Sequence, residues 1–266
     1  MAGVNPAGPA IPGPSPTASP AAPAPGFGPD LARRLLAEAV GTALLVTVVV
    51  GSGIAAQRLS PDDVGLQLFE NSTATVFGLA VLILLFGPVS GAHLNPVVSA
   101  ADWLLGRRGR TGLPGPDVVA YAGAQVVGAI AGAVLANVMY GLDAGQIATH
   151  ERVSSGVLVG EVVATAGLIA LIFALARTGR APLSAAAVGA YIGSAYWFTS
   201  STSFANPAVT VGRVFSDTFA GIAPSSVAPF VAVQVVGAGV GIALVRALYP
   251  DVGQTADDAV VPHHHG

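Results

Sequence analysis

The pattern of apolar and charged positions divides the chain into long uncharged segments. Six of them occur, at residues 39–57, 71–101, 118–142, 162–176, 181–212 and 218–245. A helix needs about 20 apolar residues to cross the hydrocarbon core of a bilayer. Four segments fit one such helix each, because the one at 162–176 continues through Glu161 into the uncharged residues 153–160. We therefore predict a bundle of membrane-spanning helices.

The other two segments, 71–101 and 181–212, are too long for one helix and too short for two. Near its end, each is interrupted by an Asn-Pro pair, Asn95-Pro96 and Asn206-Pro207. A full span followed by a half-span that enters and leaves on the same side uses the excess length. Non-helical backbone at membrane depth is tolerated only where protein or a water-filled cavity satisfies it. The alternative is a pair of ordinary Asn-Pro turns in loops.

Three short signatures recur in the same order in the two halves of the chain. AEAVGT with Glu38 matches GEVVAT with Glu161, AHLNPVVS matches SFANPAVT, and QVVGA occurs at both 125–129 and 234–238. Each half holds three spans, so the second half enters the membrane inverted. Inverted repeats place functional elements near the midplane, between the halves. The predicted fold is therefore an all-α membrane protein with six transmembrane helices and two re-entrant half-helices in an inverted repeat.

Each Asn-Pro pair has the chemistry of a helix start. Asparagine caps the first turn with its side-chain oxygen, and proline at the next position loses no hydrogen bond. We expect half-helices at roughly 96–105 and 207–216, with each asparagine NH₂ free to donate into a cavity. Two helix N-termini that face each other present partial positive charge, which repels cations and favours neutral oxygen-bearing molecules.

The composition agrees with a membrane protein. Hydrophobic residues make up 53% of the chain and charged residues 9%, against roughly 25% charged in soluble domains. This composition excludes a soluble enzyme with a conventional charged surface. The absence of cysteine excludes a disulfide-stapled module and a thiolate zinc site. The chain has no lysine and a net charge of −3, so it offers no basic face for nucleic acid.

Two tails flank the predicted channel domain, which spans residues 31–249 with halves at about 31–142 and 153–249. Residues 1–30 contain nine prolines, seven alanines and five glycines, and we expect them to be disordered. A proline-rich docking segment is the alternative, and a secretory signal is not, because the basic start and long apolar run are missing. Residues 250–266 are expected to be disordered too. We expect their three consecutive histidines, 263–265, to belong to a frayed end, and a metal site is the alternative.

The arginines indicate the orientation. With six spans and two re-entrant segments, both termini lie on the same side of the membrane. That side carries eight arginines and the other side three, Arg58, Arg152 and Arg213. Positive charge accumulates on the cytoplasmic side, so both termini are expected in the cytoplasm.

The motifs AEAVGT, SGAHLNPVV, AQVVGA, GEVVAT, FANPAV and VQVVGA resemble those of the major intrinsic proteins, the aquaporin and aquaglyceroporin family, over about residues 31–249. The resemblance implies six tilted helices, two half-helices, a pore in each subunit, a homotetramer and a place in the cell membrane. It also assigns the two pore motifs. These are Asn95, Pro96 and Val97, where the family has NPA, and Asn206, Pro207 and Ala208.

The selectivity filter departs from the pattern of that family. An arginine usually follows the second NPA, and here that position is Val209. Counting back from the asparagines puts Thr75, Ser194 and Ser203 at the other filter positions. Ser194 has three aromatic neighbours along the chain, Tyr191, Tyr196 and Trp197. The stretch from Ser200 to Pro224 looks like the branch associated with arsenic-resistance operons, which pass trivalent arsenicals.

Loss of the guanidinium removes five donors and a fixed charge from this ring. We therefore expect a wide filter. Arg213, one helical turn beyond Val209, is either a charge at the pore mouth or an interfacial anchor.

Three other polar residues lie within the predicted spans or next to Asn95. Glu38 and Glu161 occupy equivalent positions, and an ionisable residue inside a membrane is a functional candidate. They are either proton sites or acceptors that support the re-entrant loops, and the symmetry favours loop support. His93, two residues before Asn95, is either a gating or catalytic residue or part of the loop packing, and we favour packing.

The sequence predicts a passive channel for water and small neutral solutes. Glycerol-like polyols and trivalent metalloid hydroxides such as As(OH)₃ are the favoured solutes, because As(OH)₃ resembles glycerol in size and hydroxyl display. The alternative is a proton-coupled secondary transporter that uses Glu38 and Glu161. An enzyme is not expected, because no nucleophile–base pair or metal-binding pattern accompanies the polar residues. No cofactor is expected.

Overall fold

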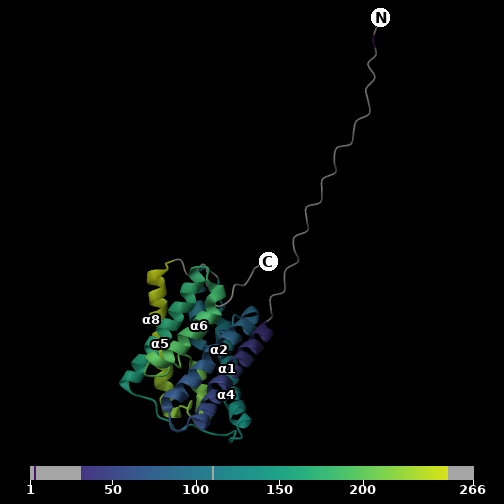
Figure 1. Cartoon of the computed structure of the whole chain (residues 1–266). Helices are drawn as coiled ribbons and strands as arrows, with labels where there is room; N and C mark the ends of the chain where they lie inside the picture. The colour runs from purple at the N-terminus through teal and green to yellow at the C-terminus, as the bar shows by residue number, and fades with distance from the viewer. Residues whose placement is uncertain (1–2, 4–30, 110, 251–266) are drawn as a thin grey trace.

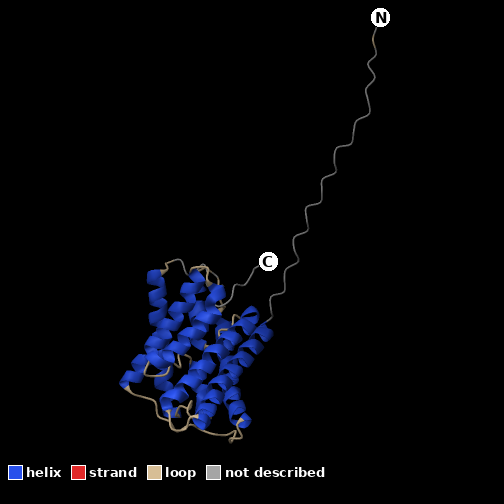
Figure 2. Cartoon of the chain, in the orientation of Figure 1, coloured by secondary structure: helices blue, strands red, loops and turns tan. Residues whose placement is uncertain are grey.

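The structure, a computed structural model, describes residues 3, 31–109 and 111–250. Apart from Gly3 and Pro250, the two tails expected to be disordered lie outside the described residues. The described part of the chain consists of helices joined by loops and turns, without a strand (Figure 2). The predicted all-α fold is confirmed.

The elements follow the predicted order of two similar halves. The first half contains α1 (Leu31–Leu59), α2 (Val64–Ser90), α3 (Pro96–Gly106) and α4 (Gly115–Met139). The second half contains α5 (Ser155–Arg177), the 3₁₀ turn η1 (Ala181–Leu183), α6 (Ser184–Phe198), α7 (Pro207–Gly212), the 3₁₀ turn η2 (Arg213–Phe215) and α8 (Pro224–Leu248). The half-helices are α3 and α7.

In the part of the chain that the structure describes, five helices are long and apolar enough to cross a membrane: α1, α2, α4, α5 and α8. The sixth, α6, has 15 residues, which at 1.5 Å per residue extends about 22 Å. The preceding η1 lengthens this helical segment to 181–198. The long uncharged segment 181–212 therefore divides into a short sixth span and a half-helix.

The packing of the helices repeats between the halves. α1 packs on α4, and α5 packs on α8 in the equivalent way. Each half-helix packs on the last helix of both halves, because α3 contacts α4 and α8, and α7 contacts α8 and α4. α2 and α6 complete the contact between the halves, and the labelled helices form one bundle (Figure 1). These shared contacts bring the starts of α3 and α7 together inside the bundle.

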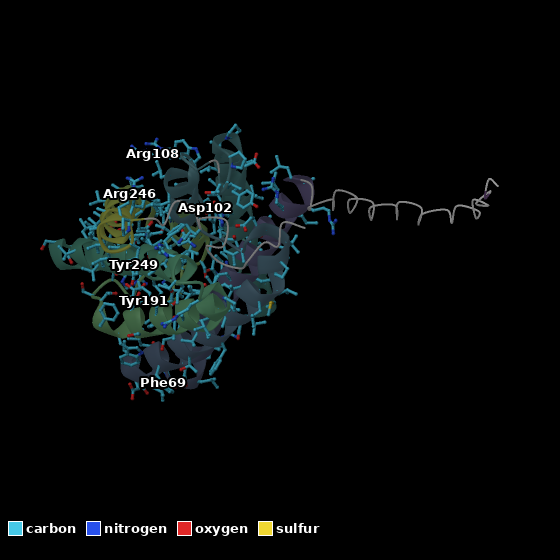
Figure 3. All side chains as sticks on the ribbon, turned by 90° about the horizontal axis from the view of Figure 1, so that it is seen from above. Phe69, Asp102, Arg108, Tyr191, Arg246 and Tyr249 are labelled. Atoms are coloured by element: carbon cyan, nitrogen blue, oxygen red, sulfur yellow. The ribbon has the colours of Figure 1, made fainter. Side chains whose placement is uncertain are left out.

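The C-terminal ends of α3 and α8 lie close together. Arg246 near the end of α8 donates a hydrogen bond of 3.2 Å to the carbonyl oxygen of Leu104 in α3. Seen from above, Arg108 and Arg246 lie on one side of the molecule and Phe69 on the opposite side (Figure 3).

Candidate functional site

The two half-helices begin at the Asn-Pro pairs, as predicted. Asn95 is the N-cap of α3, and its side-chain oxygen accepts from the backbone N–H of Val97 at 3.1 Å. Asn206 caps α7 by accepting from Ala208 and Val209 at 3.0 and 3.2 Å. A proline occupies the first helical position of each half-helix, where a missing N–H costs nothing.

The two asparagines also join the two loops. Asn95 Nδ2 donates to the carbonyl oxygen of Ala205 at 2.8 Å, and Asn206 Nδ2 donates to that of Leu94 at 2.7 Å. Each amide therefore uses one N–H to hold the opposite loop, rather than keeping its whole NH₂ for the cavity. An amide carries two N–H groups, so one donor of each asparagine remains for a molecule in the pore.

The loops that precede the asparagines have the same unusual backbone. Ala92 and Leu94 have φ of 46° and 49°, and Ser203 and Ala205 have φ of 52° and 47°. These residues lie three and one positions before each asparagine. A left-handed conformation in a non-glycine residue costs roughly 1–3 kcal/mol and persists only where the surroundings impose it.

Glu38 and Glu161 provide those surroundings. The carboxylate of Glu38 accepts from the backbone N–H groups of His93 and Leu94 at 3.0 and 2.7 Å. Glu161 accepts from Phe204 and Ala205 at 2.8 and 2.9 Å. Both glutamates are completely buried. Each carboxylate thus holds the left-handed loop of its own half.

Two glutamines extend this arrangement. Gln125 Nε2 donates to Glu38 at 2.7 Å, and Gln234 Nε2 donates to Glu161 at 2.7 Å. Gln125 also donates to Ser99 at 3.2 Å, as Gln234 does to Thr210 at 2.9 Å. These two glutamines were not among the site residues predicted from the sequence. Their signal was the identical QVVGA motif in both halves.

An inner cavity of about 70 Å³ lies between the loops and the surrounding helices. Asn95 and Asn206 line it, together with the predicted filter residues Thr75, Ser203 and Val209. Most of the other lining residues are apolar side chains of α1, α2, α5 and α6. The lining includes no carboxylate of the described residues. Val97 and Ala208 pack in the hydrophobic core rather than on the cavity.

Ser194 does not line this cavity, and its assignment to the filter needs correction. Its position on α6 is exposed, whereas Ile192 and Tyr196 on the same helix line the cavity. At 3.6 residues per turn, positions 192 and 196 share a face. Position 194, two residues from each, points the other way. Tyr196, whose hydroxyl lies 3.3 Å from that of Thr75, occupies the place expected for Ser194.

His93 belongs both to the loop and to the cavity wall. Its backbone N–H donates to Glu38, and its Nδ1 lies 3.0 Å from the hydroxyl of Ser99. Its ring tilts against that of Tyr121, with the centroids 5.5 Å apart. The imidazole lines the inner cavity. Packing in the loop and contact with the pore therefore occur in the same residue.

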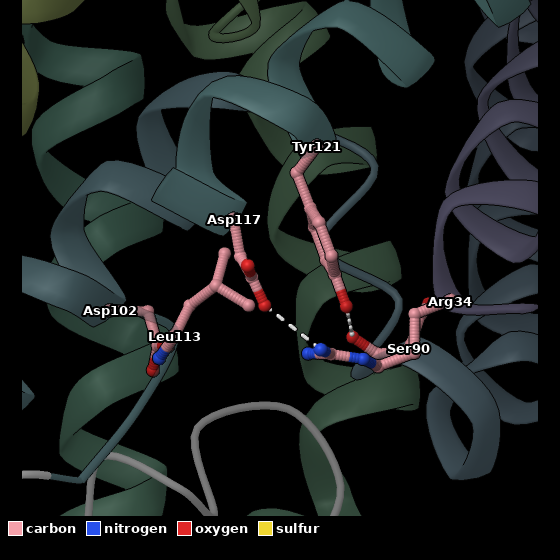
Figure 4. Close-up of polar contacts among 6 residues, drawn as sticks. All are labelled: Arg34, Ser90, Asp102, Leu113, Asp117 and Tyr121. Carbon is pink, nitrogen blue, oxygen red and sulfur yellow. Dashed lines mark hydrogen bonds and ion pairs between the residues drawn. The ribbon is translucent and has the colours of Figure 1, made fainter. Parts of the chain in front are cut away.

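Further contacts secure the loop from α4. The Tyr121 hydroxyl donates to the carbonyl oxygen of Ser90 at 2.9 Å, where α2 ends (Figure 4). Next to it, Arg34 of α1 and Asp117 of α4 form an ion pair at 2.8 Å (Figure 4). These contacts fix α4 against the residues that lead into the first Asn-Pro loop.

An outer cavity of about 530 Å³ adjoins the inner one. Its lining includes Gln67, Asn71, His150, Arg152 and Asp217. Only two of the residues that line the inner cavity also line the outer one.

The two shared residues are Tyr196 and Arg213. They therefore mark the passage between the cavities.

Arg213 is buried beside the loop of the second half. Its guanidinium carbon lies 3.5 Å from the centroid of the Phe204 ring, and its Nε donates to the carbonyl oxygen of Ala220. Arg152, from the loop between α4 and α5, reaches the same ring at 5.3 Å. This role of Arg152 was not predicted, because Arg152 lies far from Phe204 along the chain.

The comparisons with known proteins agree with this geometry. The sequence model of the family described as Major intrinsic protein matches residues 28–203. Aquaglyceroporin AqpS of Rhizobium meliloti (strain 1021) is 46% identical over 86% of this chain and 97% of its own. The Glycerol uptake facilitator protein of Pseudomonas aeruginosa is 35% identical over 74% of this chain and 78% of its own.

A solved structure has the same fold. The X-ray structure of the aquaglyceroporin from Plasmodium falciparum superimposes with a TM-score of 0.59 at 20% identity, covering 83% of this chain and 96% of that one. The family match spans well over half of the chain. With capped half-helices that meet inside an inverted repeat, this chain belongs to the major intrinsic protein family.

Proposed function

We propose that the protein is a passive channel for water and small neutral solutes, and that glycerol-like polyols and trivalent metalloid hydroxides pass through it. The observation that carries this proposal is the chemistry of the inner cavity. It is lined by two asparagines, by His93 and Arg213, and by hydroxyl and apolar side chains, without a carboxylate of the described residues. The buried hydroxyl of Ser203 has no hydrogen-bond partner within the described chain. It is therefore available to a hydroxylated solute.

A proton-coupled transporter that used Glu38 and Glu161 would need their carboxylates to face the transport path. Both oxygens of Glu38 and both oxygens of Glu161 accept hydrogen bonds from the loops and the glutamines. Neither glutamate lines the inner cavity. This arrangement supports a structural role for the two carboxylates and a channel without coupling.

The membrane arrangement follows from the same proposal. The excess of arginine on the side of the termini, eight against three, supports cytoplasmic termini in a cell membrane. The outer cavity, with Arg152 and Arg213, then opens away from the cytoplasm. Large apolar side chains are exposed on several spans, including Phe77, Leu84 and Val127. They suit contact with lipid and with neighbouring subunits of a homotetramer, each subunit with its own pore.

Placing an arginine at position 209 tests the width of the filter. Val209 is buried and lines the inner cavity, so Val209→Arg fills space and adds a charge. We expect glycerol and arsenite flux to fall by at least about tenfold, and water flux to fall less. Stopped-flow light scattering of proteoliposomes measures all three solutes. Val209→Leu adds bulk without charge and separates the two effects. A wild type that passes only water would contradict the proposed solute range.

Solute flux is expected to be independent of pH between 6.5 and 8. Burial, then Arg152 and Arg213, lower the pKa of His150 below its ordinary 6.5, so its imidazole stays neutral in this range. Burial lowers the pKa of Arg152 to about 10, which leaves it charged.

The contribution of His150 to stability has the opposite sign from that of a paired histidine. Because its pKa is lower in the folded state, stability decreases as the pH falls below 6.5. Glycerol uptake at pH 6.5, 7 and 8 should agree within about twofold. A steep dependence on pH would favour the coupled transporter.

A further inference from the structure

We propose that Tyr196 and Arg213 form the selectivity constriction of this channel, one helical turn outside Val209. In this arrangement the ring at Val209 sets the width of the pore. The guanidinium of Arg213 excludes cations and donates hydrogen bonds to the hydroxyl groups of neutral solutes. The inference deepens the proposed function, on which it rests. It is carried by the position of these residues, which are shared by the lining of the inner and outer cavities.

Arg213 is held firmly enough to act as a fixed element of the pore. It is 3% exposed, its guanidinium stacks on Phe204, and its Nε is bonded to Ala220. The backbone N–H of Phe204 is bonded in turn to Glu161. Among the described residues, only Nε of its side chain makes a hydrogen bond. The four N–H groups of its two terminal nitrogens are therefore available to a solute at the passage.

Arg152 supports this position from the other side of the loop. Its Nε donates to the carbonyl oxygen of Gly221 at 2.7 Å, and its Nη2 donates to that of Phe219 at 2.9 Å. Three consecutive carbonyls, of residues 219–221, thus accept from two arginines. This loop places the Nε of Arg213 and so determines where its guanidinium lies.

The positive charge at the passage is not cancelled by ion pairing. Arg152 and Arg213 bond to carbonyls, and neither forms an ion pair with a carboxylate of the described residues. Asp217 also lines the outer cavity, where its Oδ1 accepts from the N–H and hydroxyl of Thr149. The buried guanidinium of Arg213 and that of the half-buried Arg152 therefore keep their charge close to the pore. A cation that leaves bulk water at this point meets repulsion in a low-dielectric environment.

Tyr196 supplies the opposite chemistry. Its hydroxyl lies 3.3 Å from the hydroxyl of Thr75, and Thr75 also donates to the carbonyl oxygen of Asn71 at 2.9 Å. When Thr75 donates to Asn71, the tyrosine O–H is the donor in the Tyr196–Thr75 pair. The phenolic oxygen then keeps acceptor capacity. A polyol at the passage donates to this oxygen while its own oxygens accept from Arg213.

The test combines cation leak with polyol flux in proteoliposomes that contain the full chain. Arg213→Gln removes the charge and keeps a polar side chain, whereas Arg213→Lys keeps the charge and loses the planar fork. We expect Arg213→Gln to raise potassium permeability, measured with a potential-sensitive dye, by at least about tenfold. Glycerol should still pass. Arg213→Lys should keep the low potassium permeability of the wild type and pass glycerol more slowly than the wild type.

Arg58→Gln is the matched control. Arg58 is at the same end of the molecule, next to Gln57 of the outer cavity. The guanidinium carbon of Arg58 lies 5.2 Å from the centroid of the Tyr140 ring, and its Nη2 donates to the carbonyl oxygen of Tyr140 at 2.7 Å. Arg58 lines neither cavity. Its substitution should leave potassium leak and glycerol flux at wild-type values. Equal potassium leak in Arg213→Gln and Arg58→Gln would overturn the proposal.

Tyr196→Phe tests the constriction even if the arginine variants do not fold. Loss of the hydroxyl should lower glycerol flux relative to water flux by about threefold to tenfold. An unchanged ratio would overturn the role of Tyr196 in the constriction. Failure of the proposed function has a different signature, because the wild type would then pass no glycerol while potassium leak would still report on Arg213.

Discussion

Glu38→Ala is expected to abolish solute flux and to destabilise the protein strongly. Four donors converge on this carboxylate: the hydroxyl of Ser90, the backbone N–H groups of His93 and Leu94, and the amide of Gln125. Alanine leaves these buried donors without an acceptor, at about 1–3 kcal/mol each where no water replaces it. A loss of about 4 kcal/mol or more in the free energy of unfolding follows. The left-handed loop should then relax and disturb the start of α3.

The measurement is the thermal midpoint of the purified protein, combined with glycerol flux in proteoliposomes. A loss of about 4 kcal/mol corresponds to a midpoint lower by about 10 °C. Glu151→Ala is the control, because Glu151 is exposed and, among the described residues, accepts only from the hydroxyls of Ser225 and Ser226. Water can replace those bonds, so little change is expected. If Glu38→Ala behaved like Glu151→Ala, the supporting role of the carboxylate would be wrong.

Gly128→Ala is expected to separate α4 from α1. A Cβ at this position would lie against the carbonyl oxygen of Ala39, well inside van der Waals contact, and Gly132 has the same relation to Ala43. Backbone cannot rotate aside as a flexible side chain can. The helices must therefore move apart, which should cost about 3 kcal/mol and lower both the thermal midpoint and the flux.

Gly123→Ala on the same helix is the control. A Cβ there meets no atom within 4 Å, so the thermal midpoint should stay the same or rise slightly. The second half offers the same pair of positions. Gly237 faces the carbonyl oxygen of Val162, whereas Gly239 is open. Equal midpoints for Gly128→Ala and Gly123→Ala would show that close approach of the backbones does not hold the bundle together.

The sequence was sufficient for the features that depend on local chemistry. Uncharged length located the spans, and the capping preference of Asn-Pro located the starts of α3 and α7 at Pro96 and Pro207. The internal repeat in the sequence pairs Glu38 with Glu161. Length alone did not show that α6 is a short span. The 3₁₀ turn η1, which directly precedes α6, extends this short span by one turn.

The filter was harder to predict because its residues come together across loops. Counting back from Asn206 to Ser194 assumes a register that the irregular segment 199–205 does not keep, with left-handed backbone at Thr202, Ser203 and Ala205. Tyr196 therefore occupies the position expected for Ser194. Arg152 reaches the ring of Phe204 from the distant loop between α4 and α5. A contact between residues so far apart in the sequence cannot be predicted from periodicity or motif spacing.

Glycerol flux as a function of the imposed gradient tests the central claim most directly. In proteoliposomes containing the wild-type chain, a passive channel predicts flux that rises linearly with the glycerol gradient. Internal glycerol should stop rising when it equals the external concentration, with or without a proton gradient. Saturation of the flux, together with accumulation above the external concentration when a proton gradient is applied, would contradict the channel and favour a coupled transporter.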